Sequence, residues 1–157
     1  MRLGLIGGTA MTSLAADVIE TTRVDQIVAQ TRYGEVPLTC IQSGTDEFIF
    51  LERHHGSGIT PPHNINHRAN IEALAGAGVD GILAVCSVGT IPTDFPPGSV
   101  GYATQYIDFT GVAMSFHDDD AQFTSVTNPF DEEMNQTLKS VLQPMQPDLI
   151  LTRTYWL

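Results

Sequence analysis

One short segment of the chain, Leu51–Gly56, has residue types that suit the binding of an oxyanion. It contains Arg53 and His54 directly after a run of apolar residues that reads as a strand. Arginine presents a planar fork of donors to phosphate, and histidine adds a further donor once a bound anion favours its protonated form. An arginine paired with a surface carboxylate fits the same pattern, so this segment alone leaves both interpretations open.

Two further segments have glycine and small residues after an apolar run. In Ile6–Thr9, two glycines let the backbone approach a ligand closely, and Thr9 adds a hydroxyl donor. In Ala84–Thr90, an apolar strand leads into Cys86, Ser87 and glycine, where backbone N–H groups can meet an anion. Neither segment matches the dinucleotide-binding fingerprint or the P-loop. Each also fits a plain turn after a buried strand.

Charge and hydropathy exclude several classes of function. The net charge is −11, with seven Lys and Arg against 18 Asp and Glu. Such a surface repels nucleic acid and anionic membranes, and no apolar run approaches the ~20 residues of a membrane span. A small anion can bind only where backbone N–H groups and a placed arginine overcome this field. Cys40 and Cys86 lie in apolar runs and are expected to be buried free thiols in a reducing cytoplasm, with a disulfide between them as the alternative.

A metal site is the main alternative for the histidines. His63 and His67 are four residues apart, and His54 is close in sequence. Zinc uses such a pair when both histidines lie on one helix and a third ligand joins them. The prolines before His63 place it in a loop, which disfavours that geometry. The acidic run Asp118–Asp120 lacks the glycine and distal glutamate of a calcium-binding loop and is expected to be solvated.

The elements that would position these segments follow from apolar periodicity and turn residues. Gly44 predicts a hairpin between two strands, and Asn66 and Asn128 are candidate helix N-caps. The expected strands span residues 2–6, 36–42, 46–52, 79–88, 99–104 and 149–156, and the expected helices span 66–77 and 129–142. This order predicts a single α/β domain over residues 1–157, with a mixed central sheet and flanking helices. The strand-like ending, 153–157, leads us to expect a fold that is incomplete at the C-terminus.

Several motifs occur together and in order along nearly the whole chain. They are Gly7–Thr9, Thr31–Gly34, Leu51–His54, Asn66–Leu74, Ser87–Thr90, Gln105–Thr110 and Asn128–Phe130. The series resembles the branch of the purine nucleoside phosphorylase family that uses 5'-methylthioadenosine and methylthioinosine. Asn66–Leu74 together with the Arg53-His54 pair is the specific part of this resemblance.

The resemblance implies a trimeric, cytoplasmic enzyme with a phosphorylase-like fold. Members cleave the N-glycosidic bond of a purine nucleoside with inorganic phosphate, giving free base and ribose 1-phosphate, and need no metal or organic cofactor. The positions that would contact phosphate are Thr9, Arg53, His54, Cys86 and Ser87, the last two through backbone groups. The residues that would contact the purine should lie beyond Leu157, so the chain is expected to be part of a longer pentosyltransferase.

Three other functions fit the same residues. The chain could be a non-catalytic anion-binding module of the same fold. It could be an assembly module that uses the apolar stretch Tyr106–Met114 as an interface, although this stretch is expected in the core. It could also be a metal-dependent hydrolase that uses His54, His63 and His67.

Overall fold

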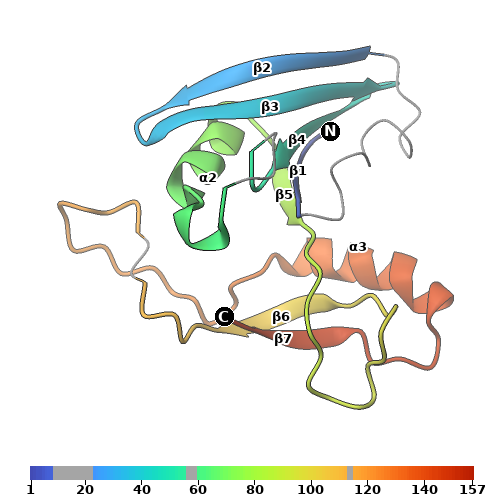
Figure 1. Cartoon of the computed structure of the whole chain (residues 1–157). Coiled ribbons are helices and arrows are strands. Elements are labelled where there is room, and N and C mark those ends of the chain that lie inside the picture. The colour runs from blue at the N-terminus through green and yellow to red at the C-terminus, as the bar shows by residue number, and fades with distance from the viewer. Residues whose placement is uncertain (9–22, 56–59, 113–114) are drawn as a thin grey trace. The chain divides into compact units, whose positions relative to one another are not determined.

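The computed structural model describes residues 1–8, 23–55, 60–112 and 115–157 (Figure 1). These residues form two compact units, Met1–Val88 and Gly89–Leu157. Both units fall within the single domain expected for residues 1–157, which stays a prediction.

The first unit contains a mixed five-stranded sheet with the strand order β2-β3-β4-β1-β5 (Figure 1). Its strands are β1 (Arg2–Gly7), β2 (Arg23–Thr31), β3 (Gly34–Ser43), β4 (Asp46–Glu52) and β5 (Gly81–Ala84). Strand β1 pairs in parallel with both β4 and β5, whereas β3 pairs antiparallel with both β2 and β4. The mixed α/β sheet expected from the sequence is therefore confirmed.

The antiparallel part of this sheet is built from two hairpins. The β3–β4 hairpin turns at Gly44, whose φ of +56° is open to glycine without steric cost, as the sequence predicted. The β2–β3 hairpin turns before Gly34, whose φ is +132°. Strand β2 was not predicted, because most of its residues are exposed and its apolar residues do not alternate. It is held by backbone pairing at the edge of the sheet.

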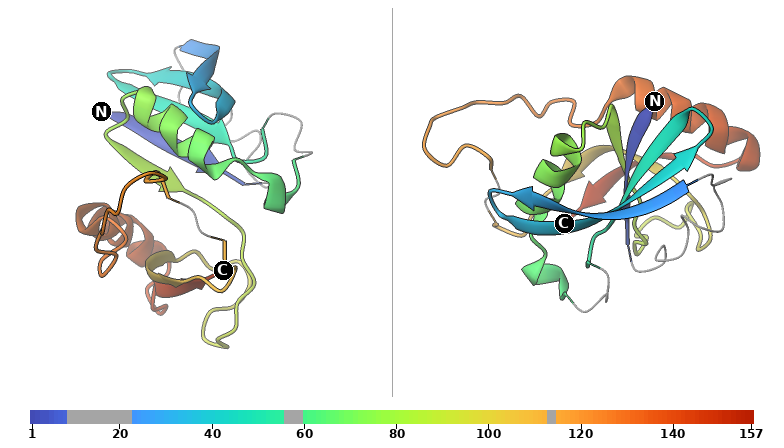
Figure 2. Two further views of the ribbon diagram at one scale, coloured as in Figure 1. Left: turned by 90° about the vertical axis from the view of Figure 1, so that its left-hand side faces the viewer. Right: turned by 90° about the horizontal axis from the view of Figure 1, so that it is seen from above.

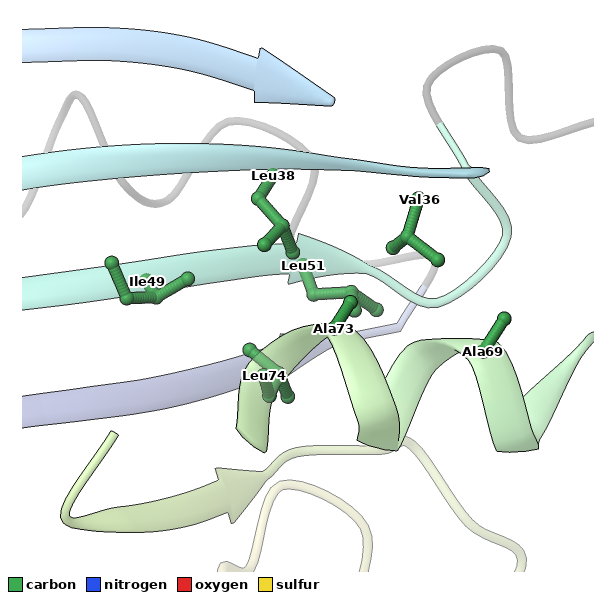
Figure 3. Close-up of a cluster of buried hydrophobic side chains, with 7 residues drawn as sticks. All are labelled: Val36, Leu38, Ile49, Leu51, Ala69, Ala73 and Leu74. Carbon is green, nitrogen blue, oxygen red and sulfur yellow. The ribbon is translucent and has the colours of Figure 1, made fainter. Parts of the chain in front are cut away.

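Helix α2 (His67–Gly76) covers one face of the sheet and closes the core (Figure 3). Asn66 caps its N-terminus, since its side-chain oxygen accepts the N–H of Ala69 at 3.1 Å, which confirms the predicted cap. Leu74 is fully buried, and its side chain lies next to Gly4 of β1. The buried cluster consists of Val36, Leu38, Ile49, Leu51, Ala69, Ala73 and Leu74.

Strand β5 corrects the expectation of a buried strand over residues 79–88. Only Gly81–Ala84 pairs with β1, and the other side of β5 has no partner in the described part of this sheet. Ile82 and Leu83 are half-buried and Val85 is 39% exposed. The apolar run is longer than the strand, because pairing with β1 ends at Ala84 while the apolar residues continue beyond it.

The second unit contains a two-stranded parallel sheet of β6 (Tyr102–Ile107) and β7 (Thr152–Trp156), with helix α3 (Glu132–Leu142) beside it (Figure 2). Asn135 of α3 donates to the carbonyl of Ala103 on β6 at 3.4 Å. The described residues also include two short 3₁₀ helices, η1 (Pro62–Asn64) in the first unit and η2 (Gln143–Met145) in the second.

Two expectations for the second unit are wrong. Helix α3 begins three residues later than the expected start at residue 129, because Asp131, not Asn128, accepts the N–H of Met134 as the cap. The stretch Tyr106–Met114 is not core, since Phe109 is 72% exposed; Met114 lies outside the described residues. Among the described helices, none has the length and apolar character needed to cross a membrane.

Candidate functional site

Three parallel strands of the first unit end at the same edge of its sheet. Strand β1 ends opposite β4, with Gly7 in register with Glu52, and Ile6 is in register with Ala84 of β5. Because parallel strands share a direction, the residues that follow them emerge together. Gly8, Arg53 and the segment 85–87 therefore lie at one edge, although they are far apart in sequence.

Backbone hydrogen bonds continue the sheet by one residue on each side of β1. The N–H of Arg53 donates to the carbonyl of Gly7 at 3.0 Å, and the N–H of Val85 donates to the carbonyl of Ile6 at 2.9 Å. These two bonds fix the positions at which both chains leave the sheet. The side chain of Arg53 consequently starts next to the glycine turn.

The guanidinium of Arg53 packs directly against Gly8. A Cβ atom placed on Gly8 would lie 2.9 Å from Nη2 of Arg53 and 3.5 Å from the carbonyl oxygen of Val85. A contact of 2.9 Å is shorter than carbon and nitrogen tolerate, so only glycine leaves room for the guanidinium here. The sequence led us to expect that the glycine backbone approaches a ligand, which stays a prediction; the neighbour that the structure gives Gly8 is the guanidinium of Arg53.

Arg53 differs from other arginines of the first unit in its partners. Arg2, Arg23 and Arg32 form ion pairs with Glu47, Asp25 and Glu72 respectively. In the part of the chain that the structure describes, Arg53 makes no ion pair and its guanidinium makes no hydrogen bond. The alternative of a surface salt bridge, which the sequence left open, is therefore not realised among these residues.

His54 is held by the main chain on one side of its ring. Its Nδ1 lies 2.8 Å from the carbonyl oxygen of Thr60. A carbonyl oxygen only accepts, so Nδ1 carries a hydrogen. Nε2 can then donate to an anion only when the ring is protonated, and otherwise it accepts a hydrogen bond, for example from a protonated phosphate oxygen.

Cys86 and Ser87 follow β5, and both are exposed. The expectation that Cys86 is buried is wrong, because β5 ends at Ala84 and the chain leaves the sheet before the cysteine. Cys40 on β3 is half-buried, and burial raises the pKa of its thiol, with a smaller contribution from Glu47. Thr9, the remaining predicted phosphate contact, lies outside the described residues.

The model of the Phosphorylase superfamily matches residues 2–156. The chain belongs to this superfamily. Its fold agrees, since methylthioadenosine phosphorylase from Schistosoma mansoni in complex with adenine superposes with a TM-score of 0.78 at 26% identity, over 93% of this chain and 55% of that one.

Relatives in the superfamily have names that match the branch expected from the motifs. A probable S-methyl-5'-thioinosine phosphorylase of Methanocaldococcus jannaschii is 33% identical over 142 residues, which is 89% of this chain and 53% of that protein. The 6-oxopurine nucleoside phosphorylase of Pyrococcus furiosus is 38% identical over 109 residues, 69% of this chain and 39% of that protein. The chain thus spans about half the length, or less, of the curated relatives it matches.

His54, His63 and His67 are the histidines that the sequence offered as metal ligands. Within the described ranges, no three His, Cys, Asp or Glu side chains are grouped so that they could hold a metal ion. His63 lies in η1 and His67 begins α2, so the two do not share one helix. The pKa of His67 is lowered by burial and then by the positive charge of Arg53, which indicates that the two side chains lie near each other.

Sequence reasoning missed two polar residues next to the site. His55 donates from Nε2 to the side-chain oxygen of Asn70 at 2.7 Å, and Asn70 is only 3% exposed. The available signal was the buried register of Asn70 on α2, between Ala69 and Ala73. A buried asparagine at such a position requires a hydrogen-bond partner.

Proposed function

We propose that this chain is the phosphate-binding part of a purine nucleoside phosphorylase that acts on methylthioadenosine, methylthioinosine or a related nucleoside. The observation that supports this most is the contact between Arg53 and Gly8 at the shared end of three parallel strands. A guanidinium that has no carboxylate partner among the described residues, and that lies beside glycine backbone, suits an oxyanion in a chain whose net charge is −11. Arg53, His54, Thr9, Cys86 and Ser87 are the proposed phosphate contacts, the last two through their backbone.

The reaction sets out what these residues would do. The bond between the anomeric carbon and the purine nitrogen breaks, its electron pair leaves with the purine, and the purine takes up a proton. A phosphate oxygen then forms the new bond to the anomeric carbon. Arg53 and the backbone groups would hold phosphate beneath that carbon, where its charge stabilises the cation-like transition state. The site thus needs inorganic phosphate as co-substrate and no metal or organic cofactor.

The assembly and location are part of the same proposal. We infer that the full protein is a cytoplasmic homotrimer whose partners are the nucleoside and phosphate. The superfamily match and the name of the relative support nucleoside and phosphate as partners. The trimer and the cytoplasmic location are taken from the family resemblance alone.

Replacing Arg53 tests the proposed phosphate site. We expect Arg53→Ala to weaken phosphate binding by about 1.5–3 kcal/mol, the usual worth of a charged hydrogen bond. Calorimetric titration with inorganic phosphate measures this loss. Arg23→Ala is the matched control, because it removes the same charge from the outer strand β2, where Arg23 pairs with Asp25. Equal phosphate affinity in the two variants would contradict the assignment of Arg53.

The second candidate is an anion-binding module without catalysis. It is favoured by the composition of the site, because the groups gathered among the described residues suit an oxyanion and none of them is assigned to the purine. Under either candidate this chain should bind phosphate but release little or no free base by itself, since none of its residues is assigned to the purine. The proposed full protein that contains this chain separates the two candidates when it is titrated with phosphate and then with methylthioadenosine. Nucleoside binding with release of free base supports the phosphorylase, whereas phosphate binding without nucleoside binding supports the module.

A further inference from the structure

His55 has a backbone conformation that its side chain does not favour. Its φ is +52°, and among the described non-glycine residues it is the one with a positive φ. The left-handed region brings Cβ close to the following carbonyl, so a residue other than glycine adopts it only when its surroundings require it. The position lies two residues after Arg53, in the turn by which the chain leaves β4.

Two hydrogen bonds hold His55 in this conformation. Its N–H donates to the carbonyl of Glu52 at 2.8 Å and closes the turn. Its ring donates from Nε2 to Oδ1 of Asn70 at 2.7 Å, because an amide oxygen only accepts. Asn70 lies on the buried side of α2, where the core cluster fixes it. The imidazole therefore connects the turn after β4 to a rigid helix.

Glycine would meet the backbone requirement of this turn without strain. A histidine with a buried partner indicates that the side-chain connection itself is needed. The hydrogen bond between His55 and Asn70 fixes the turn that contains Arg53 and His54. His54 is also held by the hydrogen bond from its Nδ1 to the carbonyl of Thr60. Among the described residues, the remaining bonds of this turn, from Arg53 to Gly7, from His55 to Glu52 and from His54 to Thr60, are all made to backbone carbonyls, and none of them reaches α2.

We propose that His55 is a positioning residue whose bond to Asn70 holds the turn after β4 so that the guanidinium of Arg53 lies against Gly8 and binds an oxyanion. This inference rests on the proposed phosphate site. His55 acts through Arg53 and need not contact the anion itself.

The test compares phosphate affinity with thermal stability in the whole chain. His55→Gly keeps the positive φ and removes the ring, so relief of the backbone strain offsets the loss of the bond to Asn70. We expect phosphate affinity to fall about five- to tenfold while the melting temperature changes little. His55→Gln is the conservative variant, since its amide N–H can still donate to Asn70, and it should recover most of the affinity. Asn70→Ala should also lower affinity, and His55→Gly/Asn70→Ala should bind no more weakly than the weaker single variant.

Each outcome supports or overturns the inference. An unchanged phosphate dissociation constant in His55→Gly overturns it, and so do additive losses in the double variant. Retained affinity in both His55→Gly and Arg23→Ala, with reduced affinity in Arg53→Ala, overturns the role of His55 but leaves the proposed phosphate site intact. A wild-type chain that binds no phosphate overturns both.

Discussion

The two units of the molecule differ in how much of their own apolar surface they bury. In the first unit, α2 and two strands enclose a cluster in which Leu51 and Leu74 have no exposed surface. In the second unit, α3 has no buried residue, and Phe109 and Trp156 form a ring pair although each is more than half exposed. Parallel sheets are normally covered on both faces, and two strands alone are marginal. The proposed anion site is thus built on the unit that has a closed core of its own.

This difference predicts unequal effects when each helix loses an apolar side chain. Leu74→Ala in α2 should lower the free energy of unfolding by about 2–5 kcal/mol, since it leaves a cavity in a closed core. Val141→Ala in α3 truncates a residue that is 59% exposed, so the free energy of unfolding should change by less than about 0.5 kcal/mol. Urea unfolding followed by circular dichroism measures both. Equal losses would show that the two helices are buried to a similar extent in solution.

Two glycine substitutions, one in each unit, should have different effects: one should lower phosphate affinity and the other should lower stability. In Gly8→Ala the added Cβ displaces the flexible end of Arg53, so we expect phosphate affinity to fall about tenfold or more, roughly 1.4 kcal/mol, with little loss of stability. In Gly101→Ala the added Cβ would lie 2.7 Å from the backbone oxygen of Leu151, which cannot move freely. That variant should be less stable and bind phosphate as the wild type does. Calorimetry and thermal melting test both, and a reversed pattern would contradict the comparison.

A smaller effect concerns the pH dependence of the first unit. Burial and Arg53 lower the pKa of His67 in the folded chain below its ordinary value of 6.5. The unfolded chain therefore binds the proton first, and stability that is present above pH 6.5 is lost as the pH falls towards the lowered value. The loss should be under about 1 kcal/mol, because His67 is only partly buried and water screens its charge. Melting temperatures of the wild type and His67→Gln between pH 5 and pH 8, as an approximate range around the His pKa, should diverge on the acid side.

Phosphate should reduce this divergence, since an anion at Arg53 offsets the positive charge that disfavours protonation of His67. Parallel melting curves for the two proteins across the pH range would be evidence against the nearness of His67 and Arg53.

The fold was predictable where local patterns agree with tertiary packing. Apolar residues at helical spacing with Asn66 in front gave α2, and Gly44 gave the β3–β4 hairpin. The errors arose where nonlocal pairing decides the outcome. Strand β2 exists because β3 offers it a hydrogen-bonding edge, and β5 stops at Ala84 because its pairing with β1 ends there. Neither the existence of β2 nor the end of β5 can be read from the residues of that strand alone.

The location of Arg53 and of the glycine turn after strands was predictable, whereas their role in binding an oxyanion stays a prediction. Arg53 and the glycine turn could be selected because guanidinium and backbone N–H groups are the donors that an oxyanion needs. Their direct contact depends on the parallel register of β1 and β4. This register places Gly7 opposite Glu52, although the two residues are 45 positions apart in sequence. The tie between His55 and Asn70 could not be predicted, because it requires the turn conformation as well as the position of α2.

The central claim is that an oxyanion binds at the shared end of β1, β4 and β5. Residue-resolved NMR of the chain during titration with inorganic phosphate tests it most directly. We predict saturable shifts of the backbone amides of Gly8, Cys86 and Ser87 and of the side-chain Nε–H of Arg53, with the amides of β6 and β7 unchanged. Shifts confined to other residues, or no shift at saturating phosphate, would contradict the account.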